Sequence, residues 1–137
     1  MAAGTQVVGN TGMYFAAYRL SQMGWNVMPT SRNARGVDLL AYDANAHHFL
    51  GFQIKALSKR NPVPLGRSVD ALMGDWWIIV AQAATQPVCF VMKPDEVMRL
   101  AHRGEKDGQV SYWLQPKQYD TEKFREAWDR IGHGNVG

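Results

Sequence analysis

The sequence predicts a single α/β domain over residues 1–137, with a mixed central sheet flanked by helices. Three observations lead to this prediction. Apolar residues recur at helical spacing between Met13 and Met23, two strand-like segments separated by a short turn follow, and residues 76–81 form a continuous apolar run typical of a strand buried on both faces. A chain of 137 residues also has the usual length of one domain.

The first predicted helix is followed by a short strand. Asn10 or Thr11 is the expected cap at the start of the helix, and Gly24 is expected to end it in a left-handed turn. Residues 25–28 predict a strand that stops at Pro29, because proline cannot donate to a sheet ladder.

Residues 37–42 and 49–56 predict two strands of an antiparallel hairpin, with the turn at residues 43–48. Residues 57–74 contain two prolines and several basic residues. We expect a long exposed loop here, with at most a short helix near its end. A loop of this length is uncommon in a compact domain and often functional.

The remainder of the chain predicts alternating strands and helices. Besides the strand at 76–81, the expected elements are a strand at 88–92, a helix from 93 to about 101, a polar turn at 103–109, an edge strand at 110–114, a last helix at about 121–131 with Phe124, Trp128 and Ile131 on one face, and a frayed tail at 132–137.

Composition and net charge indicate which kinds of partner and of site the chain can have. The net charge of +3 and the pI near 9.2 favour a polyanionic partner. Cys89 is the single cysteine, so an intramolecular disulfide or a cysteine-based zinc site is excluded, and its apolar neighbours predict a buried thiol. We see no signal peptide and no apolar stretch near the ~18 residues of a membrane span, so we expect a cytoplasmic protein without a membrane segment.

Polar residues interrupt two otherwise apolar strands and define the candidate site. Because strand side chains alternate between faces, Gln53 and Lys55 point the same way, and hairpin pairing brings Asp38 beside them. Asp38, the Gln53 side-chain oxygen and the carbonyl of Phe52 or Ile54 are oxygen ligands that suit Mg²⁺ or Mn²⁺. Such a metal activates water, and Lys55 would stabilise a phosphoryl transition state.

Residues 36–38 (Gly-Val-Asp) and 53–55 (Gln-Ile-Lys), preceded by Gly9, Gly12, Ala16 and Leu20 on the helix, resemble the PD-(D/E)xK nuclease superfamily, in its restriction-endonuclease-like and Holliday-junction-resolvase-like forms. The resemblance covers roughly residues 9–82. It implies a restriction-endonuclease-like αβββ(α)β core, catalytic roles for Asp38, Gln53 and Lys55, and a Mg²⁺-dependent endonuclease that acts on double-stranded or branched DNA. It also implies a homodimer, for which the aromatic sheet edge and the last helix are candidate surfaces.

Two positions depart from the pattern of that superfamily. Gln53 stands where the motif usually has Glu or Asp, and Met13 follows Gly12 where the resolvase-like members carry a metal-supporting Glu. Each lost carboxylate weakens attraction for a divalent cation. A weak nuclease, a nuclease assisted by another carboxylate, and an inactive DNA-binding module therefore all remain open, as does a protein-interaction domain without a nucleic-acid role.

Basic residues on both sides of the motif predict a phosphate-binding rim. Contacts of this kind give sequence-independent, salt-sensitive binding. Ordinary loop solubility is the alternative explanation. The five residues are Arg32 and Arg35, before Asp38, and Lys59, Arg60 and Arg67, after Lys55.

Overall fold

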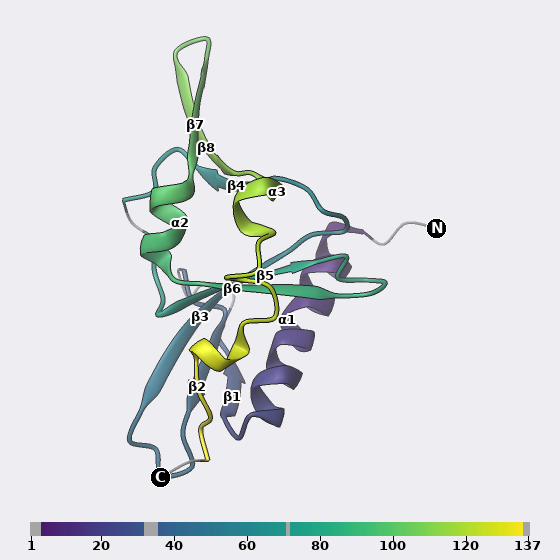
Figure 1. Ribbon diagram of the computed structural model, residues 1–137, viewed down its shortest axis with the longest axis vertical. Coiled ribbons are helices and arrows are strands. Elements are labelled where there is room, and N and C mark those ends of the chain that lie inside the picture. Colours follow the sequence, from purple (N-terminus) through teal and green to yellow (C-terminus); the bar gives the residue numbers. More distant parts are fainter. Residues whose placement is uncertain (1–3, 32–35, 71, 136–137) are drawn as a thin grey trace.

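The computed structural model describes residues 4–31, 36–70 and 72–135 (Figure 1). The elements are α1 (Thr5–Gln22), β1 (Asn26–Pro29), β2 (Leu39–Tyr42), β3 (Phe49–Ala56), β4 (Val63–Gly66), β5 (Trp76–Ala81), β6 (Val88–Met92), α2 (Pro94–Leu100), β7 (His102–Lys106), β8 (Gln109–Leu114), α3 (Pro116–Tyr119) and a 3₁₀ turn, η1 (Trp128–Arg130).

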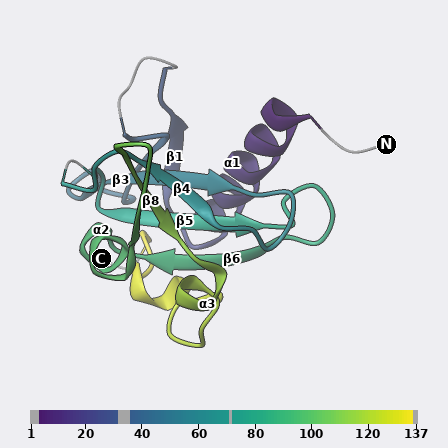
Figure 2. The ribbon, with the colours of Figure 1, turned by 90° about the horizontal axis from the view of Figure 1, so that it is seen from above.

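The strands form two sheets. The larger has the order β1-β2-β3-β5-β6 and is mixed, because β3 and β5 run parallel while the other neighbours are antiparallel. The smaller has the order β4-β8-β7 and is antiparallel. Figure 2 shows α1 against one face of the larger sheet, with α2 and α3 on its other side. The predicted α/β class, with a mixed central sheet flanked by helices, is confirmed.

Helix α1 begins at Thr5, so the prediction that Asn10 or Thr11 caps it is wrong. Thr11 lies inside the helix and its hydroxyl donates to the Val7 carbonyl at 2.8 Å. The earlier start is explained by Val8, which is buried in the core beneath the helix. Gly24 ends the segment with φ of +90°, as predicted.

Close contact between α1 and β3 depends on a glycine. A Cβ placed on Gly12 would lie 2.5 Å from the Cβ of Ala56, a separation that real Cβ atoms do not reach. The helix backbone therefore rests directly on the carboxyl end of β3. Ala16 and Leu20 continue this contact and are fully buried.

The larger sheet separates two apolar cores. Every residue of β5 is buried, which confirms the prediction for residues 76–81. Phe52 and Ile54 of β3 face the core under α1, whereas Trp77 and Ile79 of β5 face the second core. The side chains of Gln53 and Lys55 alternate with Phe52 and Ile54 and so lie on the second face.

Two predictions about connecting segments are wrong. The expected loop at 57–74 contains β4, whose Val63 is fully buried and pairs with Leu114. The expected polar turn at 103–109 is a β-hairpin, and β8 is the central strand of its sheet instead of an edge. In both segments the strands carry polar residues on an exposed face and bury few side chains. The sequence therefore lacks the apolar pattern that predicts a strand.

The expected helix at about 121–131 is also wrong. Phe124 and Trp128 belong to different cores, so one helix face cannot bury both. The segment instead runs beside β6 and satisfies its outer edge: Val91 N–H donates to the Phe124 carbonyl at 2.8 Å, and Glu126 N–H donates to the Cys89 carbonyl at 2.7 Å. Only the 3₁₀ turn η1 at 128–130 is helical in this range.

Residues 132–135 were expected to fray, but they are tied to the body. Gly134 N–H donates to the Met23 carbonyl at 3.0 Å, and the Gly134 carbonyl accepts from Ala44 N–H at 2.9 Å. The indole N–H of Trp25 donates to the Gly132 carbonyl at 2.9 Å. These bonds fasten the end of the chain to the β2–β3 hairpin and to the end of α1.

Cys89 is fully buried, as predicted, and burial raises the pKa of its thiol far above the ordinary value. A nucleophilic role for this cysteine is therefore excluded. Among the described residues, the helices are all too short or too polar to cross a bilayer.

Glu96 is a buried carboxylate, and its hydrogen bonds indicate that the fold loses stability in acid. Its burial would raise its pKa, but hydrogen bonds from Arg130, the Lys93 backbone N–H and Lys123 outweigh burial and lower the pKa from 4.5 to about 2. The unfolded state then binds more protons, so this contribution is complete above about pH 5 and is lost as the pH falls towards 2.

We therefore expect the free energy of unfolding, measured by urea titration, to fall between pH 5 and pH 2. Glu96→Gln should be less stable than the parent at pH 6 and should lose less stability over this window. Parallel curves for the two proteins would contradict the role given to Glu96.

Candidate functional site

Asp38 lies at the end of the β2–β3 pairing. Its backbone N–H donates to the Phe52 carbonyl at 2.7 Å, although Phe52 is already the register partner of Leu39, so Asp38 and Leu39 both lie opposite Phe52, as in a β-bulge. The carboxylate oxygen Oδ2 accepts a bond from Gln53 Nε2 at 3.0 Å and another from the Ile54 backbone N–H at 2.7 Å. Asp38, Gln53 and the Ile54 backbone are thus in direct contact.

The Ile54 carbonyl also faces the side of Asp38. Directly after β3, Leu57 N–H donates to the Val80 carbonyl of β5 at 2.8 Å. Because backbone groups alternate along a strand, those of residues 53 and 55 face β5, and those of residues 52, 54 and 56 face β2. Pairing with β2 ends at Asp38, since Ile54 N–H bonds to the Asp38 side chain instead of a strand backbone. A backbone oxygen is therefore presented next to the carboxylate.

Lys55 shares the face of Gln53 but turns its ammonium towards β5. Nζ lies over the indole of Trp77, 5.5 Å from the ring centroid. This is a cation–π contact of the usual range. The residue is half-buried, and its flexible four-carbon stem allows the ammonium to reach either side of the strand.

A hollow of about 440 Å³ opens beside Asp38. Its walls come from α1 and from the segment that begins at the end of β1. Met13 is among its lining residues and therefore faces the same space as Asp38. The lining residues are Asn10, Met13, Tyr14, Pro29, Thr30, Ser31 and Asp38.

Five of these lining residues were not predicted as part of the site, namely Asn10, Tyr14, Pro29, Thr30 and Ser31. A signal for Asn10 was present: it precedes Met13 by three residues, and residues three apart share one helix face. Thr30 N–H donates to the Asp38 carbonyl at 2.9 Å, a long-range contact that no local pattern reveals.

The residues around Asp38 carry oxygen ligands, although in this structure Gln53 turns its amide nitrogen towards the carboxylate, so its amide must turn over to present the oxygen to a cation. Asp38 supplies a carboxylate, Gln53 an amide oxygen and Ile54 a carbonyl, which fit a hard cation such as Mg²⁺ or Mn²⁺. Within the ranges that the structure describes, no group of three or more His, Cys, Asp or Glu side chains could hold a metal. A cation here would meet one negative charge, so its binding should be weak.

A further carboxylate, Asp75, directly precedes the neighbouring strand β5. Its Oδ2 accepts from Gly51 N–H at 2.7 Å, and Gly51 shares the face of Gln53, two residues away on β3. Asp75 is exposed, so its second oxygen remains accessible. If the site recruits another carboxylate, Asp75 is the candidate.

No contact places the three described residues of the predicted basic rim, Lys59, Arg60 and Arg67, beside Asp38. Hydrogen bonds from Arg125 and from Arg60, the latter at 2.7 Å, both reach the Asp120 carboxylate and lower its pKa. This group lines a hollow with Ala81, at the opposite end of β5 from Trp76, so Arg60 does not lie at the rim. The other four predictions are not resolved as contacts: Lys59 is exposed after β3, Arg67 is exposed directly after β4, and Arg32 and Arg35 lie outside the described residues.

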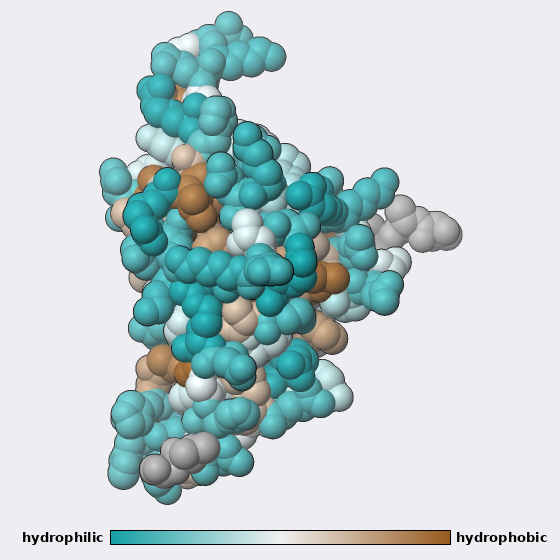
Figure 3. All heavy atoms as spheres, in the orientation of Figure 1, coloured by the Kyte–Doolittle hydropathy of each residue, from teal (hydrophilic) through white to brown (hydrophobic). Residues whose placement is uncertain are grey.

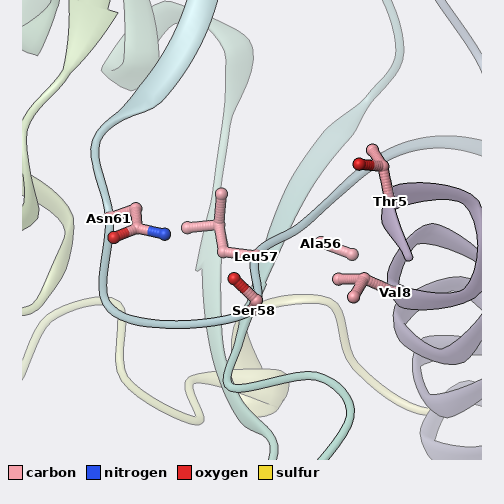
Figure 4. Close-up of a pocket in the computed structure, with 6 residues that line it drawn as sticks. All are labelled: Thr5, Val8, Ala56, Leu57, Ser58 and Asn61. Atoms are coloured by element: carbon pink, nitrogen blue, oxygen red, sulfur yellow. The ribbon is translucent and has the colours of Figure 1, made fainter. Parts of the chain in front are cut away.

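Another hollow, of about 220 Å³, lies between the start of α1 and the segment after β3 (Figure 4). Its lining has hydroxyl and amide groups but no charged side chain, so it offers no general acid, base or metal ligand. The residues are Thr5, Val8, Ala56, Leu57, Ser58 and Asn61.

The architecture is a nuclease-like fold. It is similar to the solved structure of a bacterial homing endonuclease, I-Ssp6803I, with a TM-score of 0.60, 18% sequence identity, and coverage of 94% of this chain and 91% of that chain. At this identity the likeness concerns the fold alone. Comparison with models of known protein families finds no match, and comparison with curated protein sequences finds none either.

Proposed function

We propose that the chain is a metal-dependent, nuclease-like DNA-binding protein that hydrolyses phosphodiester bonds, in repair, recombination or restriction. The observation that carries the proposal is the contact of Asp38 with Gln53 and the Ile54 backbone, beside a hollow of about 440 Å³. The fold shared with a homing endonuclease supports the choice of DNA as the partner.

In this proposal each residue has a separate task. Asp38, the Gln53 amide oxygen and the Ile54 carbonyl hold Mg²⁺ or Mn²⁺. When bound, the cation would lower the pKa of a water molecule and neutralise charge on the phosphate. Lys55 leaves the Trp77 ring and places its ammonium against the phosphoryl oxygens, where developing negative charge is stabilised.

The proposal predicts metal-dependent nicking. Purified protein should convert supercoiled plasmid to the open circle, or cleave a four-way junction, with Mg²⁺ or Mn²⁺ and not with EDTA. Binding in a shift assay without cleavage at any metal concentration would favour the inactive module. Binding to heparin and DNA that is equal, and that vanishes at physiological salt, would instead favour a protein-interaction domain.

The alternative function is a catalytically weak or inactive nucleic-acid-binding module. It is favoured by Met13, which lines the Asp38 hollow with an apolar side chain, and by the neutral amide of Gln53. Each substitution removes a carboxylate from the electrostatic field that attracts a divalent cation.

Restoring those carboxylates distinguishes the two functions. We expect Met13→Glu combined with Gln53→Glu to tighten Mn²⁺ binding at least about tenfold by titration calorimetry, because two charges join Asp38 around the cation. Met28→Glu is the matched control, since Met28 is exposed on β1 and does not line the hollow. A wild type that already binds Mn²⁺ tightly, with no gain in the double variant, would contradict a weakened site.

A homodimer remains a prediction. The last-helix surface proposed for it does not exist, because η1 replaces that helix. Sedimentation of the intact chain tests the remaining prediction.

A further inference from the structure

The β7–β8 hairpin projects beyond the body of the protein (Figure 1). Its two-residue loop consists of Asp107 and Gly108, with φ of 53° and 76°. Two consecutive positive φ values are typical of a type I′ turn, whose twist matches that of the strands. The hairpin is therefore a preorganised ribbon rather than a loose loop.

The pairing register of the hairpin places residues of different chemical character on its two faces. Arg103 pairs with Tyr112 and Glu105 with Val110, on the side that continues to buried Leu114. On that side, Arg103 also binds the Glu105 carboxylate at 3.3 Å. The opposite side, called here the ribbon face, carries the pairs His102–Trp113, Gly104–Ser111 and Lys106–Gln109.

The ribbon face has hydrogen-bond donors and no carboxylate at its paired positions. Lys106 and Gln109 are exposed at its outer end. Trp113, at its base, is 38% exposed and donates from its indole nitrogen to Ser111 Oγ at 3.1 Å. On the side that Figure 3 shows, the projecting end is predominantly hydrophilic, so this side offers little apolar surface for a second copy of the chain to bury.

We propose that the ribbon face enters the major groove of double-stranded DNA and reads base edges; this inference rests on the proposed function. The major groove, about 12 Å wide, accommodates a two-stranded ribbon. Five residue pairs span about 17 Å at roughly 3.4 Å per residue, which is the length of about five base pairs.

The side chains have the chemistry of base recognition. A glutamine such as Gln109 bonds both N6 and N7 of adenine, and a lysine such as Lys106 bonds O6 and N7 of guanine. Asp107 in the turn can accept from the amino group of cytosine. Arg67 directly follows β4, which pairs with β8 beside the base of the ribbon, so it is placed to contact a phosphate.

The test is selection from a pool of random duplexes of about 30 base pairs, in EDTA so that no cleavage occurs. Wild type should enrich a short sequence. Lys106→Ala combined with Gln109→Ala should lose that preference and bind the enriched duplex about tenfold to a hundredfold more weakly. Arg103→Ala combined with Glu105→Ala is the control, because it removes the ion pair on the opposite side and should keep the preference. Thermal melts establish that both variants fold.

An unchanged sequence preference in the Lys106/Gln109 variant overturns the inference, as does equal loss in the control. Wild-type binding to duplex DNA without any preference also overturns it, while leaving the proposed function in place. Failure of wild type to bind duplex or branched DNA overturns both. If the Lys106/Gln109 variant changes mass in sedimentation, the face contacts a second copy and the inference fails.

Discussion

Asp38→Asn is expected to lower metal-dependent cleavage at least about a hundredfold while leaving DNA binding in EDTA nearly unchanged. Asparagine keeps an oxygen that can accept from Ile54 N–H, a bond of 2.7 Å in the parent, so the local backbone should persist. It removes the negative charge that holds the cation. Metal ions contribute several kcal/mol to such reactions, and about 1.4 kcal/mol corresponds to tenfold in rate.

Initial rates of plasmid nicking, measured across a range of Mg²⁺ and Mn²⁺ concentrations, check this expectation. Asp129→Asn serves as the control, since Asp129 is an exposed carboxylate in η1, which is far from the site residues in the sequence and belongs to a different element. If Asp38→Asn and Asp129→Asn cleave equally fast, the activity comes from another site or from a contaminating nuclease.

Neighbouring residues of β3 should separate stability from activity. Phe52→Ala should destabilise the protein by about 3–5 kcal/mol, because Phe52 is fully buried and truncation leaves a cavity under α1. Lys55→Met should cost less than about 1 kcal/mol, because the methionine keeps most of the apolar stem over Trp77 and only the cation–π contact is lost. The same substitution should nearly abolish cleavage.

Urea unfolding at pH 7 gives both free energies, and nicking assays on the folded variants give the rates. Lys117→Met is a matched control for Lys55, since Lys117 is exposed on α3. A large loss of stability for Lys55→Met, or full activity in that variant, would contradict the assignment of the two faces of β3.

The features that could be predicted from the sequence are those in which local pattern and burial agree. The β2–β3 hairpin brings Asp38 beside Gln53 because its strands pair around one turn, and β5 is apolar because both of its faces are buried. Lys55 follows from the same alternation, but its position over Trp77 depends on a strand that joins from a distant part of the sequence.

The errors arise where long-range contacts override local pattern. Phe124 and Trp128 have helical spacing, yet each enters a different core, and the backbone between them bonds to β6. The β7–β8 hairpin had a local signal, Asp107-Gly108, which is the dipeptide preferred in type I′ turns. The second strand was predicted, at 110–114, but the first, β7, was missed because its residues are mostly polar. Arg60 was expected at the site, but its partner Asp120 is 60 positions away in the sequence.

Anomalous diffraction from a crystal soaked in Mn²⁺ measures the position of the cation directly. The expected result is a peak bounded by the Asp38 carboxylate, the side-chain oxygen of Gln53 and the Ile54 carbonyl. A saturating soak that leaves this position empty, or that places manganese only elsewhere, would contradict the assignment of these residues to a metal-dependent phosphodiesterase site.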